Sequence, residues 1–61
     1  MIKAQYKIRI LIVEDERLSA EDLSIRLTHN DFEVVGIAGT GAEALKLTAD
    51  TKPDIILMDI K

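Results

Sequence analysis

The fold class of this chain follows from one apolar stretch and the acids that end it, IRILIVEDE at residues 8–16. Residues 8–13 are short, β-branched and nearly all apolar, which is typical of a parallel strand covered on both faces. From about Glu16 to His29 the pattern becomes helical. The side chains that form its expected core stripe are Ala20, Leu23 and Leu27.

The same alternation continues along the chain. A second strand is expected at residues 33–38 (EVVGIA), and a second helix from about Gly41 to Ala49 or Asp50. Thr40 and Glu43 form a capping box at the start of that helix. After the helix, Pro53 breaks the hydrogen-bond ladder.

The third strand is expected at residues 55–58, and it ends in Asp59. The resulting order is β-α-β-α-β with short connections, which predicts an α/β fold with a parallel sheet. If the first and third strands are neighbours, the strand order is 2-1-3.

Composition excludes several classes of protein. The 61 residues contain no cysteine and one histidine, so a disulfide scaffold, a zinc module and a cysteine nucleophile are excluded. The net charge of −3 gives no electrostatic reason to bind nucleic acid or an anionic membrane. No apolar run approaches the ~20 residues of a membrane span, and the first residues lack the apolar region and cleavage site of a secretory signal. We therefore expect a soluble cytoplasmic protein.

Acidic residues mark the ends of two of the expected strands. With strand order 2-1-3, Glu14, Asp15 and Asp59 meet at the carboxyl edge of the sheet, where open parallel sheets bind ligands. Two charges about 4 Å apart repel by ~4 kcal/mol at an effective dielectric of 20, so we expect a cation there or a protonated carboxyl group. Oxygen ligands of this kind suit magnesium.

Simpler explanations exist for several of the acidic residues. Asp15 and Glu16 precede a helix, where the helix dipole favours carboxylates. Asp59 alone could be a solvated residue near the end of the chain. His29 is expected on the surface in the last turn of the first helix.

Several motifs together resemble the receiver domain of two-component response regulators. They are ILIVEDE at residues 10–16, VVG at 34–36, TGAEAL at 40–45 and PDIILMD at 53–59. The resemblance covers nearly every residue from Ile8 to Lys61. It implies the first half of a doubly wound, flavodoxin-like fold.

The resemblance also implies roles for individual residues. Asp59 matches the aspartate that accepts a phosphoryl group from a partner histidine kinase. Asp15 matches the residue that ligates Mg²⁺ directly, and Glu14 its neighbour that assists through water. Lys61 matches the position whose backbone carbonyl completes the metal site. The implied function is that of a phosphoacceptor signalling domain and not of an enzyme.

The sequence matches only the first half of the family's domain. The family's domain continues through two more strands and three more helices, which supply a hydroxyl residue and a lysine that hold the phosphoryl oxygens. We therefore expect residues 1–7 to be a frayed lead and residues 8–61 a truncated receiver domain that does not switch by itself.

Two other hypotheses remain at this point. The first is a half-domain that assembles with a copy of itself, with no chemistry, because an exposed apolar edge recruits other strands. The residues of that edge are Ile55, Ile56, Leu57 and Met58. Leu18 and Ile25, on the far side of the first helix from the core stripe, also favour assembly.

The second is a small-molecule enzyme or dinucleotide binder. It is the weakest, since Gly36, Gly39 and Gly41 do not have the G-x-G-x-x-G spacing and follow the second strand. Those glycines are better explained by turns and close packing.

Overall fold

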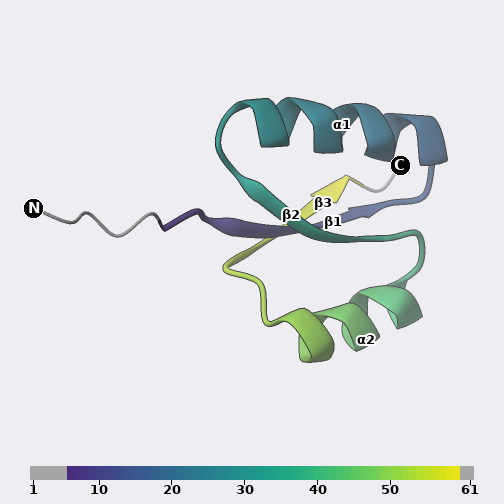
Figure 1. The fold of residues 1–61 in the computed structure, drawn as a ribbon. Coiled ribbons are helices and arrows are strands. Elements are labelled where there is room, and N and C mark those ends of the chain that lie inside the picture. Colours follow the sequence, from purple (N-terminus) through teal and green to yellow (C-terminus); the bar gives the residue numbers. More distant parts are fainter. Residues whose placement is uncertain (1–5, 60–61) are drawn as a thin grey trace, which may run out of the picture.

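The computed structural model describes residues 6–59 and confirms the α/β order (Figure 1). Three parallel strands form one sheet in the order β2-β1-β3. Helices α1 and α2 lie on opposite sides of this sheet (Figure 1). The elements along the chain are β1 (Arg9–Glu14), α1 (Arg17–His29), β2 (Glu33–Ala38), α2 (Gly41–Thr51) and β3 (Ile55–Asp59).

The observed bounds differ slightly from the expected ones. Strand β1 begins one residue later than expected and includes Glu14, because Glu14 is still paired with Asp59 of β3. Helix α1 begins at Arg17, and α2 runs on to Thr51. His29 is exposed in the last turn of α1, as expected.

The central strand β1 is buried from both sides, as its apolar sequence predicts. Alternate side chains of a strand point to opposite faces. Ile10 and Ile12 pack with Ala20 of α1, and the stripe residues Leu23 and Leu27 join this cluster.

The other face of β1 packs toward α2. Leu11 and Val13 lie with Ala38, and with Ala44 and Leu47 of α2. Leu11 and Ile12 expose none of their surface. The core therefore has two thin layers that share one strand.

Strand β2 carries an irregularity that the sequence did not indicate. Its ladder with β1 pairs Ile10 with Val34 but Leu11 with Gly36, so one residue, Val35, is extra. An extra residue of this kind is a β-bulge. Val35 packs against the α2 side of the core.

Strand β3 is an edge strand that lies away from both helices. It pairs with β1, and among the described residues no Cα atom of α1 or α2 lies within 8 Å of a Cα atom of β3. All five of its residues are exposed. The expected edge is thus present, with apolar side chains on both of its faces.

The helix ends follow local chemistry. Thr40 Oγ1 accepts a hydrogen bond from the Glu43 backbone N–H at 3.1 Å, and Glu43 Oε1 accepts one from Gly39 N–H at 2.7 Å. The expected capping box is therefore formed, with Gly39 as the second donor. Neither helix in the described range 6–59 combines the length and the apolar character needed to cross a membrane.

Candidate functional site

The structure brings two of the predicted acids side by side. Glu14 and Asp59 are register partners at the carboxyl ends of β1 and β3, two strands separated by about 4.8 Å. The pleat directs both side chains to the α1 face of the sheet. Asp15 follows directly in the chain. Lys61 lies outside the described residues.

The three acids differ in exposure. Asp15 and Asp59 are exposed, whereas Glu14 is only 2% exposed. Glu14 Oε2 accepts a hydrogen bond from the Glu16 backbone N–H at 2.9 Å, which fixes the turn between β1 and α1. Glu14 therefore has a role in shaping this edge, and the two accessible carboxylates flank it.

The donor set fits a magnesium ion better than a transition metal. Among residues 6–59, no group of three or more His, Cys, Asp and Glu side chains is arranged to hold a metal ion. Mg²⁺ needs only one or two carboxylates, because it keeps several of its waters. Asp15 and Asp59 supply such oxygens at this edge.

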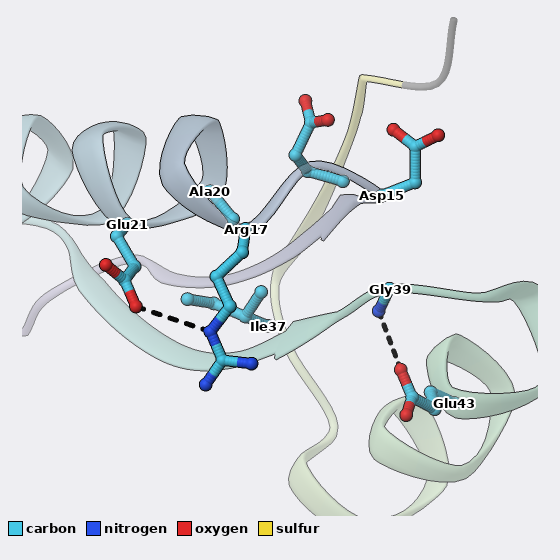
Figure 2. Close-up of a pocket in the computed structure, with 8 residues that line it drawn as sticks. Asp15, Arg17, Ala20, Glu21, Ile37, Gly39 and Glu43 are labelled. Carbon is cyan, nitrogen blue, oxygen red and sulfur yellow. Dashed lines mark hydrogen bonds and ion pairs between the residues drawn. The ribbon is translucent and has the colours of Figure 1, made fainter.

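A cavity of about 350 Å³ lies on the other side of β1 from β3, at the carboxyl ends of β1 and β2 (Figure 2). Arg17 reaches across it and pairs with Glu21, with 3.4 Å between Nε and Oε2. Ile37 forms an apolar part of its wall. The cavity includes Glu14 and Asp15 but not Asp59, so it adjoins the predicted site without containing the predicted acceptor. Its lining residues are Glu14, Asp15, Arg17, Ala20, Glu21, Ile37, Gly39 and Glu43.

A polar cluster joins the opposite, amino ends of β1 and β3. The Tyr6 hydroxyl donates a hydrogen bond to Asp54 Oδ2 at 2.6 Å, and the Arg9 backbone N–H donates to the same oxygen at 2.8 Å. The Asp54 backbone N–H in turn donates to the Arg9 carbonyl at 2.8 Å. Arg9 and Asp54 are thus joined by two reciprocal bonds.

These contacts change the acidity of both side chains. The hydrogen bond from Tyr6, followed by that from the Arg9 backbone, lowers the pKa of Asp54. The hydrogen bond to Asp54, with a smaller contribution from desolvation, raises the pKa of Tyr6. The Arg9 guanidinium also donates to the carbonyls of Thr51 and Lys52, at 2.6 and 3.0 Å, and so closes the end of α2.

Sequence reasoning missed this cluster. Tyr6 belongs to the lead that was expected to fray, yet its hydroxyl is hydrogen-bonded to a residue 48 positions away. The available signal was Asp54 itself, an acid placed directly before an apolar strand. The cavity-lining pair of Arg17 and Glu21 was also missed, although its i, i+4 spacing on a helix is a recognisable signal.

The fold and the acids at its carboxyl edge define a class, the doubly wound α/β domains that carry an acidic site at a switch point between strands. A family model described as the response regulator receiver domain matches residues 10–61. This chain therefore belongs to the response regulator receiver domains. No solved structure matches it.

Curated relatives point to the same family. The transcriptional regulatory protein PdtaR of Mycobacterium tuberculosis is 47% identical over 53 residues, which are 87% of this chain and 26% of PdtaR. Response regulator GacA of Pseudomonas viridiflava is 42% identical over 55 residues, which are 88% of this chain and 26% of GacA. The chain therefore spans about a quarter of the length of these relatives.

A relative of a different kind carries a similar segment. Protein-glutamate methylesterase/protein-glutamine glutaminase 1 of Syntrophus aciditrophicus is 46% identical over 55 residues, which are 87% of this chain and 15% of that protein. The similar segment thus occurs in proteins whose names denote different activities.

Proposed function

We propose that this chain is a phosphoacceptor segment of a two-component phosphorelay, with Asp59 as the residue that receives the phosphoryl group from a histidine kinase. The observation that carries the proposal is the register pair of Glu14 and Asp59 at the carboxyl edge of β1 and β3. That edge lies at the β1/β3 switch point, where sheets of this order bind ligands. Family membership supports the same reaction.

In the proposed step, an Asp59 carboxylate oxygen attacks phosphorus. The new P–O bond forms as the P–N bond to the kinase imidazole breaks, and the imidazole nitrogen leaves with the bonding electron pair. Asp59 is exposed, so a partner's phosphohistidine can approach it in line. Glu14 holds the β1–α1 turn, and this places Asp15 at the same edge.

Asp15 and Asp59 would hold Mg²⁺, with Glu14 assisting through water. When bound, the ion offsets the charge of the carboxylates and of the transferring phosphoryl group. The Lys61 carbonyl stays a proposed fourth contact. The two accessible carboxylates support this assignment, because together they concentrate negative charge where a cation is needed.

The proposal can be tested with magnesium and beryllofluoride, a phosphoryl analogue, followed by NMR. We expect the amide resonances of Glu14, Asp15 and Asp59 to shift, and Asp59→Asn to abolish the response. Asp50→Asn, which removes an exposed acid of α2, is the matched control and should respond as the unaltered protein does. Unshifted amides at all three acids would contradict the proposal.

One observation favours a second candidate function, self-assembly through the edge formed by Ile55, Ile56, Leu57 and Met58. Neither helix covers this edge, and Met58 is 61% exposed. An uncovered apolar strand with unpaired backbone groups is a template for another strand. A second copy of the chain could pair there and extend the sheet.

Sedimentation across the micromolar range tests the assembly. We expect mass to rise with concentration, and Ile56→Lys to abolish the rise by placing a charge at the interface. Leu45→Lys, at an exposed position of α2, is the matched control. A folded monomer at every concentration would exclude this second function.

A further inference from the structure

The register of β3 on β1 needs a determinant other than hydrophobic patterning. A strand with one buried face has a strongly specified register, because a slip by one residue would expose its apolar side chains. Strand β3 has little of this protection, because its four apolar residues are 36–61% exposed. Ile55 and Leu57 lie on one face, Ile56 and Met58 on the other, and within residues 6–59 neither helix brings a Cα atom within 8 Å of either face.

A slip of one residue would have a large effect at the carboxyl edge. It would place Met58 beside Glu14, or Asp59 beside Val13. In the second case Asp59 would move to the α2 face of the sheet, since neighbours along a strand alternate in direction. Either slip separates the two carboxylates that the observed register brings together.

The Arg9–Asp54 pair supplies a determinant at the amino end. Asp54 contacts Arg9 twice, through its backbone N–H to the Arg9 carbonyl and through its carboxylate to the Arg9 backbone N–H, each at 2.8 Å. The Tyr6 hydroxyl secures the same carboxylate oxygen. A slipped strand would place a different residue opposite Arg9, and Pro53 and Ile55 have no side-chain acceptor to replace the carboxylate.

The Arg9 side chain also holds the chain that leads from α2 into β3. Its guanidinium binds the carbonyls of Thr51 and Lys52, which directly precede the turn into β3. The connection between α2 and β3 is therefore fixed at both of its ends by Arg9. These bonds restrict movement of β3 along β1.

We propose that Asp54 is a positioning residue, which sets the register of β3 through its two contacts with Arg9 and so places Asp59 beside Glu14. The role of Asp54 in setting the register does not depend on any reaction at Asp59. Its consequence for phosphoryl acceptance rests on the function proposed above for Asp59.

The test compares Asp54→Ala with Asp54→Asn in the absence of metal. Asparagine keeps an oxygen that accepts the Arg9 N–H, whereas alanine does not. For Asp54→Ala we expect loss of the NOEs that connect register partners Ile12 and Leu57, and amide exchange about tenfold faster in β3. Asp54→Asn should retain the NOEs. Amides of α1 and β2 should keep their protection in both variants, because β3 contacts neither element.

Two more variants make the comparison decisive. Asp54→Glu keeps the charge but displaces the carboxylate by one methylene, so it should loosen β3 even if Asp54→Ala fails to fold. Asp50→Ala removes another exposed acid and should leave the β3 NOEs and exchange unchanged. Unaltered register NOEs and β3 exchange in both Asp54→Ala and Asp54→Glu would overturn the inference.

A magnesium titration then separates the inference from the proposed function. If both hold, Asp54→Ala should bind Mg²⁺ about tenfold more weakly, and Asp54→Asn should restore the affinity. Loss of register in Asp54→Ala, together with no Mg²⁺ binding by the unaltered protein, would support the positioning role and contradict the metal site. Unchanged Mg²⁺ affinity in a variant that has lost the register would overturn the link between them.

Discussion

At Gly36 the backbone of β2 runs against two leucine side chains. A Cβ atom added there would lie 3.3 Å from Leu11 Cδ1 and 3.4 Å from Leu47 Cδ1. We expect Gly36→Val to lower the free energy of unfolding by about 1–3 kcal/mol, because the core must shift to accept it. Thermal unfolding followed by circular dichroism measures this effect.

Gly41 provides the contrasting position. A Cβ atom there would meet nothing within 4 Å, and the residue has no positive φ. Gly41→Ala should therefore raise stability by roughly 0.4–1 kcal/mol. Equal effects of the two substitutions would contradict the packing role of Gly36.

The Tyr6–Asp54 hydrogen bond predicts a specific pH dependence. Because folding lowers the pKa of Asp54, its contribution to stability is present above the ordinary aspartate pKa and is lost as pH falls through the lowered value. Folding raises the pKa of Tyr6, so its contribution is present below the ordinary tyrosine pKa and is lost as pH rises through the raised value. Stability should be highest between these limits.

Tyr6 is the sole tyrosine of the chain, so phenolate absorbance reports its titration directly. We expect Asp54→Asn to return its pKa toward the ordinary tyrosine value, because the charged acceptor is lost. Asp50→Asn should leave the titration curve in place. An identical curve in Asp54→Asn would contradict the assigned cause.

At the scale of the elements, α2 depends on its first turn. Thr40 Oγ1 satisfies the Glu43 backbone N–H, which has no partner within the helix. Thr40→Ala should lower stability by about 1 kcal/mol, measured by urea unfolding. Thr28→Ala in α1 is the control, since the Thr28 hydroxyl only bonds back to the Ser24 carbonyl. If Thr28→Ala lowered stability as much as Thr40→Ala, the capping role of Thr40 would be contradicted.

The elements differ in how far the sequence predicts them. Local patterns predicted the type of strand β1, of helix α1 and of the cap of α2. The observed ends of these elements differ from the predicted ends by one or two residues. The bulge at Val35 was not predicted, because alternation in β2 is the same with or without an extra residue in its ladder. The Tyr6–Asp54 contact was not predicted either, since no local pattern links residues at the two ends of the chain.

The candidate site was predicted to a similar degree. Strand order predicted that Glu14 and Asp59 lie at the same edge of the sheet, but their direct pairing depends on the register of β3, which the sequence did not predict. The burial of Glu14 did not, because it depends on Glu14 being the last residue of β1 and on the bond to Glu16. Roles that depend on magnesium or on a kinase stay predictions.

At the scale of the whole molecule, stability depends on very few side chains. A chain of this length has roughly 3–9 kcal/mol of stability, from about 0.05–0.15 kcal/mol per residue. Leu11 is fully buried, and Leu11→Ala should cost about 2–5 kcal/mol. Urea unfolding monitored by circular dichroism should show that Leu11→Ala has lost most of the cooperative unfolding transition.

Leu45→Ala is the matched control for that prediction. Leu45 is 76% exposed on α2, so its truncation should change stability by less than about 0.5 kcal/mol. Comparable losses for the two leucines would show that the thin core on the α2 side does not dominate stability.

The bulge in β2 has a consequence for how this segment tolerates changes of length. Val35 is the extra residue of the bulge and has no partner of its own in the β1–β2 ladder. A chain without Val35 would therefore still pair Ile10 with Val34 and Leu11 with Gly36. Every remaining side chain of β2 would stay on the same face of the sheet. Removal of Ile37 instead would shift Ala38 into the position beside Ile12 and reverse its direction. Strand β2 can therefore lose one particular residue without inverting the sheet, and natural shortening of this strand should be confined to that position.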